Sequence, residues 1–408
     1  MQALTILAPT GVDERSHEET AQLQQVQVAI DATPLSVDHP LCLDFLQDLS
    51  KRLLSAANAK KHPELVALGF WLRRNNLNAL FLLYDTSSET NTPIRKPLGL
   101  VVHFTPSNVD TMFIYSWVCA LLCGNNNIIR VATAKTDLQD TLLATIDELL
   151  NTSTYYDIAI RNCFVSYAKD SQVSAMLSRV ADARVIWGGD ESVTAIRSLD
   201  CKPRCRDICF ADRYSATLIA LNADHSSTQV DDLARKIRKD TEPYHQQACS
   251  SPRVMYFIGS STLLIDLLER LDHIAHGSDD SITRANNQLV NSQLVKSVDS
   301  EAKVFAFDNI TAAVVKGVSE QMMDWHGGEN VFYIRHIEHV DAIYNDAVTK
   351  LQTLSYFGVD KEALLKLSSD SSISGIDRIV PVGQALDFSP DWDGYQLREQ
   401  LTRSVVLR

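Results

Sequence analysis

A regular alternation of short apolar runs with amphipathic stretches begins at Leu98 and constrains the fold more than any other feature of this sequence. Runs at residues 99–104, 127–132, 158–167 and 184–187 have the length of buried strands. The stretches 110–124, 136–151, 171–181 and 191–198 have helical spacing. Strands that alternate with helices form parallel sheets with helices on both faces. The pattern therefore predicts an α/β protein with a doubly wound parallel sheet.

A second alternation starts near Ser215, so we expect two domains. Its predicted strands are 215–221, 252–258, 302–307, 312–315 and 330–334, and its predicted helices are 230–240, 261–271 and 340–350. We expect a first domain over 1–213, which includes a peripheral arm at residues 1–40 and helices in 40–74, and a second over 214–385. Residues 386–408 form a C-terminal segment that returns to the first domain or serves oligomerisation. Within it, residues 402–408 have the pattern of an edge strand.

The charge and the cysteine content exclude several classes of protein. The net charge of −13 disfavours a nucleic-acid partner, which needs a basic surface. No apolar run reaches the roughly 18–20 residues of a membrane span, and no signal peptide is visible, so a cytoplasmic location is expected. Eight cysteines are then expected to be reduced. Cys201, Cys205 and Cys209 lack a matching second pair of ligands, so we expect core-filling thiols and no metal site.

One cysteine, Cys249, has a sequence context that suits chemistry. It stands among small polar residues in the segment 244–253, just before a predicted strand. An exposed thiolate there would attack carbonyls and thioesters, and the acyl group would stay activated on sulfur. Taken alone, the segment favours chemistry only mildly, because a buried or inert cysteine is the commoner case.

The order of several motifs resembles the aldehyde dehydrogenase superfamily, and within it the acyl-CoA reductase (LuxC-like) family. The segments that carry the resemblance are 97–110, 121–130, 185–190, 248–252, 351–353, 375–383 and 392–394. The resemblance implies an aldehyde-dehydrogenase-like fold, with a Rossmann-type cofactor domain and an α/β catalytic domain. It also implies NAD(P)H-dependent reduction of an acyl thioester to an aldehyde.

The resemblance implies catalytic roles for two residues. Cys249 would be the nucleophile, placed between the two domains and facing the nicotinamide. Asn108 would donate to the developing oxyanion together with the backbone N–H of Cys249. A helix N-cap is the alternative role for Asn108, because asparagine is also favoured there.

The same resemblance places the cofactor on the first domain, with one contact from the second. Gly188 and Gly189 would let the pyrophosphate approach a helix start, although a Gly-Gly pair is often only a turn. Arg130 stands where the superfamily keeps a lysine near the adenosine ribose, which favours NADPH while NADH stays possible; a structural ion pair is the alternative. The remaining cofactor-binding residues that the resemblance implies are Thr105, Pro106, Val193 and, for the nicotinamide ribose, Glu329.

One departure from the superfamily bears on the reaction. Its hydrolytic members use a glutamate as the base for deacylation, and the corresponding residues 209–215 contain no glutamate. Water attack on an acyl-enzyme should therefore be slow, which favours a thioester reductase over an NAD(P)⁺-dependent aldehyde dehydrogenase.

A catalytically silent scaffold of the same fold is a further alternative. The family implies acyl-CoA or an acyl-protein synthetase as acyl donor, and we expect a homo-oligomer.

Overall fold

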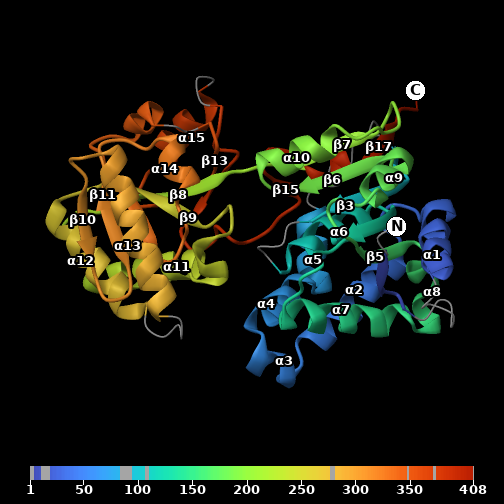
Figure 1. Ribbon diagram of the computed structural model, residues 1–408. Coiled ribbons are helices and arrows are strands. Elements are labelled where there is room, and N and C mark those ends of the chain that lie inside the picture. Colours follow the sequence, from blue (N-terminus) through green and yellow to red (C-terminus); the bar gives the residue numbers. More distant parts are fainter. Residues whose placement is uncertain are drawn as a thin grey trace. The chain divides into compact units, whose positions relative to one another are not determined.

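The computed structural model describes residues 4–10, 19–82, 94–105, 110–275, 281–346, 349–370 and 374–407 (Figure 1). The chain divides into two compact units: Met1–Ala211 together with Phe388–Arg408, and Asp212–Asp387. The chain therefore passes from one unit to the other twice. None of the described helices is both long enough and apolar enough to cross a membrane.

The first unit contains a six-stranded sheet in the order β1-β5-β4-β3-β6-β7. All neighbouring strands are parallel except β1, which pairs antiparallel with β5. Every residue of β3, β5 and β6 is buried, as expected for central strands covered on both faces. The strands are β1 (Thr5–Ala8), β3 (Leu100–Phe104), β4 (Asn126–Arg130), β5 (Asn162–Ser166), β6 (Ala183–Trp187) and β7 (Arg206–Phe210).

Helices cover both faces of this sheet and create two apolar cores. One face packs against α2, α4, α6 and α7, and the other against α1, α9 and α10. Thr136 caps α7, since its side chain accepts a hydrogen bond from the backbone N–H of Gln139. The helices are α1 (Glu19–Asp31), α2 (Pro40–Leu53), α3 (Ala56–Lys61), α4 (Pro63–Trp71), α5 (Arg74–Leu82), α6 (Met112–Leu122), α7 (Asp137–Leu150), η1 (Ser153–Tyr155), α8 (Tyr156–Ala159), α9 (Val173–Val180) and α10 (Asp190–Arg197).

The second unit contains a seven-stranded sheet in the order β10-β11-β12-β9-β8-β13-β14. Only the edge strand β10 runs antiparallel to its neighbour. The strands are β8 (Tyr214–Ala220), β9 (Pro252–Ile258), β10 (Lys303–Ala306), β11 (Thr311–Val314), β12 (Val331–His336), β13 (Leu351–Phe357) and β14 (Arg378–Pro381).

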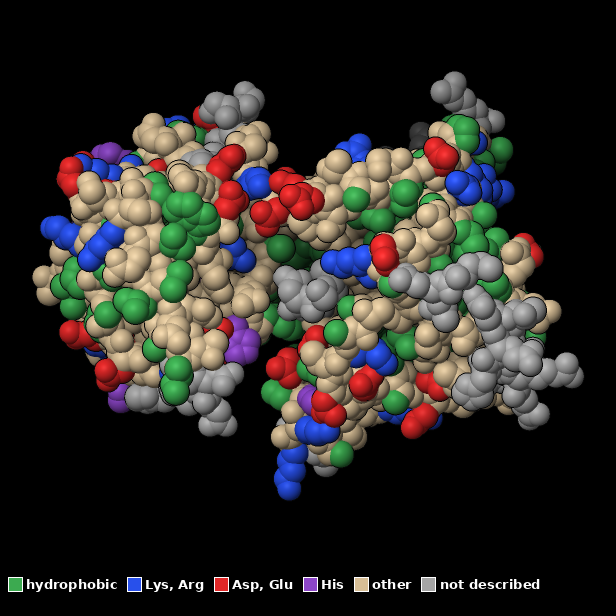
Figure 2. Space-filling model, viewed as in Figure 1, with side chains coloured by type: hydrophobic (Ala, Val, Ile, Leu, Met, Phe, Trp, Pro, Cys, Tyr) green, Lys and Arg blue, Asp and Glu red, His purple; other side chains and the backbone are tan. Residues whose placement is uncertain are grey.

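Helices again cover both faces of the second sheet. One core contains residues of α11 and α12, and the other contains residues of α13, α14 and α15. The outer side of α13 exposes Ile282, Leu289 and Val290, and Figure 2 shows apolar side chains on the part of the second unit where this helix lies. The helices are α11 (Ser227–Thr241), η2 (Pro243–Gln246), α12 (Ser261–Ile274), α13 (Ser281–Val298), α14 (Glu320–Asp324), η3 (Val340–Asn345) and α15 (Lys361–Ser369).

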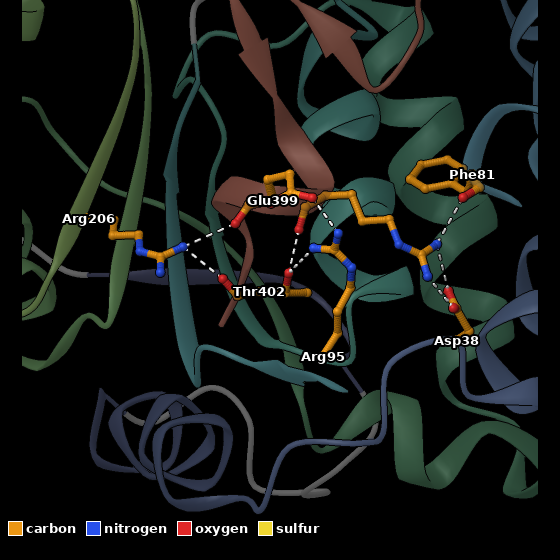
Figure 3. A network of polar contacts seen from close by, with 7 residues as sticks. Asp38, Phe81, Arg95, Arg206, Glu399 and Thr402 are labelled. Atoms are coloured by element: carbon orange, nitrogen blue, oxygen red, sulfur yellow. Dashed lines mark hydrogen bonds and ion pairs between the residues drawn. The ribbon is translucent and has the colours of Figure 1, made fainter. Parts of the chain in front are cut away.

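Three arginines fasten the C-terminal segment to the first unit (Figure 3). Arg206 donates through Nη1 to the carbonyl oxygens of Glu399, at 3.1 Å, and Thr402, at 2.7 Å. Arg398 pairs with Asp38 and donates to a backbone carbonyl, and Arg95 pairs with Glu399. The segment consists of β15 (Asp391–Trp392), β16 (Tyr395–Gln396), α16 (Leu397–Gln400) and β17 (Thr402–Val405), and β17 pairs antiparallel with β2 (Ile94–Pro97).

The predicted parallel sheets are confirmed, but several elements differ from the sequence analysis. Residues 4–10 are no peripheral arm, since β1 joins the sheet. The predicted helix 340–350 is wrong: a 3₁₀ turn, η3, ends at Asn345, and β13 begins at Leu351. The run 158–167 begins with the end of α8, and its strand starts only at Asn162. The sequence analysis missed β7, β13, α13 and α15.

Candidate active site

The loop that carries Cys249 begins with an unusual backbone. Tyr244, His245 and Gln246 all have positive φ, at 57°, 52° and 62°. Each such non-glycine residue costs of order 1 kcal/mol or more, so other contacts must hold the loop. The buried side chain of Gln246 provides them, because its Nε2 donates to the carbonyl oxygens of Pro252, at 2.8 Å, and Val331, at 2.9 Å. Its Oε1 accepts from the N–H of Val331 at 3.1 Å.

A tight turn at residues 327–330 packs directly against this loop. Gly328 has a φ of 79°, and a Cβ there would lie 2.4 Å from the carbonyl oxygen of His245. The same oxygen accepts a hydrogen bond from the N–H of Glu329 at 2.9 Å. The Glu329 carboxylate lies 3.8 Å from Nδ1 of His245, with 16% of its side chain exposed. The structure thus brings Glu329 next to the loop that carries Cys249.

Cys249 is half-buried, and its peptide is anchored near the amino ends of two strands. Ser215 donates its hydroxyl to the carbonyl oxygen of Cys249 at 2.7 Å and accepts the N–H of Thr353 at 3.3 Å. Because Ser215 itself is fully buried, the main chain at Cys249 has little freedom to move.

Four of the other cysteines are buried, unlike the half-buried Cys249. Burial raises the thiol pKa of Cys42, Cys123 and Cys163 to about 12, so these groups stay protonated and unreactive. Cys119 is also buried, with a raised pKa. The prediction that the 201, 205 and 209 cysteines fill core gaps is wrong for Cys201, which is exposed. No group of three or more metal-ligating side chains occurs among the described residues.

Two further charged or titratable side chains lie beside the nucleophile loop. Arg253 is half-buried, and its Nη2 makes a long hydrogen bond of 3.4 Å to the carbonyl oxygen of Gln247. His326 is buried, accepts the N–H of Gly328 at Nδ1, and lies 3.1 Å from the carbonyl oxygen of Val331. Burial, with help from the Arg253 charge, lowers the pKa of His326 to about 3, so it is neutral near pH 7.

In the first unit, several predicted cofactor residues lie at one edge of the sheet. The order β5-β4-β3-β6-β7 reverses direction between β3 and β6, which is where ligands bind in such sheets. Thr105 follows β3 and donates its hydroxyl to the carbonyl oxygen of Arg130 at 2.6 Å. Arg130 ends β4, with its guanidinium 5.4 Å from the ring centre of Tyr167. Among the described residues Arg130 forms no ion pair, so its charge is available.

Gly188 and Gly189 follow β6 at the same edge. A Cβ at Gly189 would meet nothing within 4 Å. Gly189 is the N-cap residue of α10 and has no side chain that could accept a hydrogen bond from the first turn of the helix. The Nε1 atom of Trp187 is buried, and no hydrogen-bond partner for it occurs in the part of the chain that the structure describes. The open space beside Gly189 at the start of α10 and this indole N–H fit a phosphate-bearing ligand. Val193 is 6% exposed and packs into the core, which leaves it little surface for a ligand.

Asn108 and Pro106 lie outside the described residues. The segment without glutamate spans the end of β7 and the start of β8, and its one carboxylate belongs to Asp212. The Asp212 side chain is 51% exposed and lies 3.6 Å from Nζ of Lys350. The supporting residues Gln246 and Ser215 were missed by the sequence analysis, as was Arg253, although its position inside the segment 244–253 was a signal.

The two sheets have the aldehyde dehydrogenase fold. The NAD-dependent aldehyde dehydrogenase from Sinorhizobium meliloti has the same fold, with a TM-score of 0.64 at 13% identity over 95% of this chain and 86% of that one. The chain belongs to the acyl-CoA reductase (LuxC) family, whose model matches residues 78–404. The fold and the family expected from the motifs are thus confirmed.

Two curated relatives carry the same name. The long-chain acyl-protein thioester reductase of Aliivibrio fischeri is 23% identical over 300 residues, which are 71% of this chain and 59% of that protein. The long-chain acyl-protein thioester reductase of Photorhabdus luminescens is 25% identical over 76% of this chain and 64% of its own length. This chain therefore spans less than two thirds of either relative.

Proposed function

We propose that the protein reduces an acyl thioester to an aldehyde with NAD(P)H, through an acyl-enzyme on Cys249. The observation that carries the proposal is the anchored, half-buried Cys249 in a strained and tightly braced loop. Such strain is common at active sites, where it positions a reacting group. Membership of the acyl-CoA reductase family and the names of the relatives supply the reaction class.

The residues of this chain would divide the work between acyl transfer and hydride transfer. The Cys249 sulfur forms a bond to the acyl carbon while the bond from that carbon to the donor sulfur breaks. The backbone N–H of Cys249 and the Asn108 amide would donate to the oxyanion. A bound dihydronicotinamide supplies the hydride that turns the enzyme thioester into an aldehyde. The half-exposed Asp212, engaged with Lys350, offers no dedicated base for hydrolysis.

We propose NADPH as the cofactor, with NADH possible. The first unit would hold it through Gly188 and Gly189 near the pyrophosphate, where the space beside Gly189 is open. Thr105 and Pro106 would line the same site, and the buried Val193 would support it from within the core. The guanidinium of Arg130, which forms no ion pair with the described residues, would favour a ribose 2′-phosphate. In the second unit, Glu329 would hold the nicotinamide ribose, since its carboxylate lies beside the nucleophile loop.

The acyl donor and the partners follow from the family. Acyl-CoA or an acyl-protein synthetase would deliver the acyl group, and the relatives' names favour the protein-bound form. Three exposed apolar residues at and just after the end of β17 support a homo-oligomer: Val405, Val406 and Leu407. We keep a cytoplasmic location in the proposal, because a thiol nucleophile needs a reducing compartment.

Intact-mass spectrometry after incubation with a panel of acyl-CoAs tests the proposal. One acyl mass should add to the protein and be lost as aldehyde when NADPH follows, and Cys249→Ala should abolish the addition. An NAD(P)⁺-dependent aldehyde dehydrogenase would instead release acid from an aldehyde. No acylation and no cofactor binding would indicate a silent scaffold.

A further inference from the structure

The guanidinium of Arg253 is short of partners for its position beside the nucleophile loop. It carries five N–H donors, yet with the described residues it makes a single hydrogen bond, of 3.4 Å, to the carbonyl oxygen of Gln247. Its Nε atom is shielded from solvent, and no described residue accepts from it. Among the described residues, no carboxylate lies within ion-pair distance of it. A shielded cation without a counter-ion is costly, so the site favours an anion.

Most of the titratable groups around Arg253 cannot serve as that anion, because they are neutral at pH 7 or are already engaged with other groups. His326 is neutral near pH 7, and burial raises the pKa of Tyr333 above its ordinary value, so neither is charged at neutral pH. The Asp212 carboxylate is half-exposed and engaged with Lys350. Cys249 lies four residues before Arg253, on the same loop whose Gln247 carbonyl oxygen accepts from the guanidinium, and a charge on its sulfur would favour the charged guanidinium.

We propose that the Arg253 guanidinium is the counter-ion that keeps the Cys249 sulfur as a thiolate. This inference rests on the proposed function and adds a positioning residue to it. The thiol gives its proton to solvent, and the sulfur then attacks the acyl carbon as the donor thiolate leaves and takes up a proton. When hydride has reached that carbon, the carbon–sulfur bond breaks, and the same guanidinium stabilises the departing Cys249 thiolate. One fixed charge thus assists both halves of the cycle.

The arrangement also fits the lack of a glutamate in residues 209–215. An ordinary cysteine thiol has a pKa near 8.5 and is only a few per cent ionised at pH 7, so an enzyme must activate it. In this chain the residues that replace the superfamily glutamate contain no glutamate, and His326 is engaged with backbone groups. A cation activates the thiol without providing a base that would also activate water, so the acyl-enzyme is spared from hydrolysis.

The test measures the thiol pKa of Cys249 in the full chain, without acyl donor or cofactor. Iodoacetamide alkylation is followed from pH 5 to 10, and peptide mass spectrometry separates Cys249 from the exposed Cys201. We expect an apparent pKa at least one unit below about 8.5 in the unmodified protein. Arg253→Gln should raise it by at least one unit, which cuts the thiolate fraction at pH 7 about tenfold.

Two further variants sharpen the result. Arg253→Lys keeps the positive charge and should keep the lowered pKa. Arg235→Gln removes an exposed arginine from α11 and should leave the titration unchanged. An ordinary pKa in the unmodified protein, or in Arg253→Lys, would overturn the inference, and so would an unchanged titration in folded Arg253→Gln. If Arg253→Gln does not fold, the apparent thiol pKa of Cys249 in the unmodified protein and in Arg253→Lys still tests the inference.

The outcome is separate from that of the proposed function. A lowered pKa without acylation by any acyl-CoA would leave the inference standing and remove the reductase proposal. Acylation at Cys249 with an ordinary thiol pKa would keep the reductase and remove Arg253 from its mechanism.

Discussion

The N–H of Glu329 donates a hydrogen bond of 2.9 Å to the carbonyl oxygen of His245, and both residues have positive φ. Two unfavourable backbone segments therefore stabilise each other across 84 residues of sequence. Their contact joins the turn that carries the candidate ribose ligand to the loop that carries the candidate nucleophile.

Gly328→Ala should loosen this junction. The new Cβ would lie 2.4 Å from the His245 carbonyl oxygen, at a φ of 79° that alanine rarely adopts. We expect a loss of about 1–3 kcal/mol in the free energy of unfolding and slower alkylation or acylation of Cys249. Gly317→Ala is the matched control, because its Cβ would meet its nearest atom at 3.4 Å. Equal stability of the two variants would contradict the proposed role of the turn.

Acid should destabilise the second unit through His326. Its pKa is lowered to about 3 in the fold, against about 6.5 when unfolded, so the unfolded chain binds a proton first as the pH falls. The stability present at pH 7 is lost between pH 6.5 and 3, and the loss from pH 7 to 5 should be about 2 kcal/mol. Urea unfolding at both pH values measures it. His326→Gln should flatten this dependence, whereas the exposed His339→Gln should not.

The sequence predicted most of the alternating strands and helices, but it did not predict β13. Residues 340–350 have helical spacing, yet the buried Asp346 accepts hydrogen bonds from the N–H of Val318 and from Arg335 and fixes a non-helical end there. In β13, Gln352, Thr353 and Ser355 are buried polar residues, so the strand lacks the apolar run that marked its neighbours. Tertiary contacts decided both cases.

The candidate nucleophile was predictable, while the residues that hold its loop were not. Cys249 stands in a recognisable segment, and its chemistry follows from its residue type. The role of Gln246 depends on contacts with Val331, which is 85 residues away. No local sequence pattern predicts hydrogen bonds between residues so far apart. The same holds for the Ser215 hydroxyl, which donates to the carbonyl oxygen of Cys249, 34 residues further along the chain.

Arg398→Met should release the C-terminal segment from the first unit. The Arg398 side chain is 6% exposed and pairs with Asp38, which would be left without this partner. We expect a loss of about 1–3 kcal/mol in the free energy of unfolding and faster proteolytic cleavage within residues 388–407, measured by mass spectrometry. Lys51→Met removes an exposed pair with Asp48 and should change stability by less than about 0.5 kcal/mol. Unchanged proteolysis in Arg398→Met would show that β17 is held without this contact.

Arg130→Met should change the choice of cofactor. The guanidinium at the end of β4 makes one long hydrogen bond of 3.5 Å, to the carbonyl oxygen of Tyr167, and so can take a phosphate. We expect the Kd for NADPH to rise about tenfold, equivalent to about 1.4 kcal/mol, with little change for NADH, as measured by dihydronicotinamide fluorescence. Arg179→Met, on the exposed side of α9, is the control for a lost positive charge. An equal loss of affinity for both cofactors would place Arg130 at a part of the nucleotide that the two share.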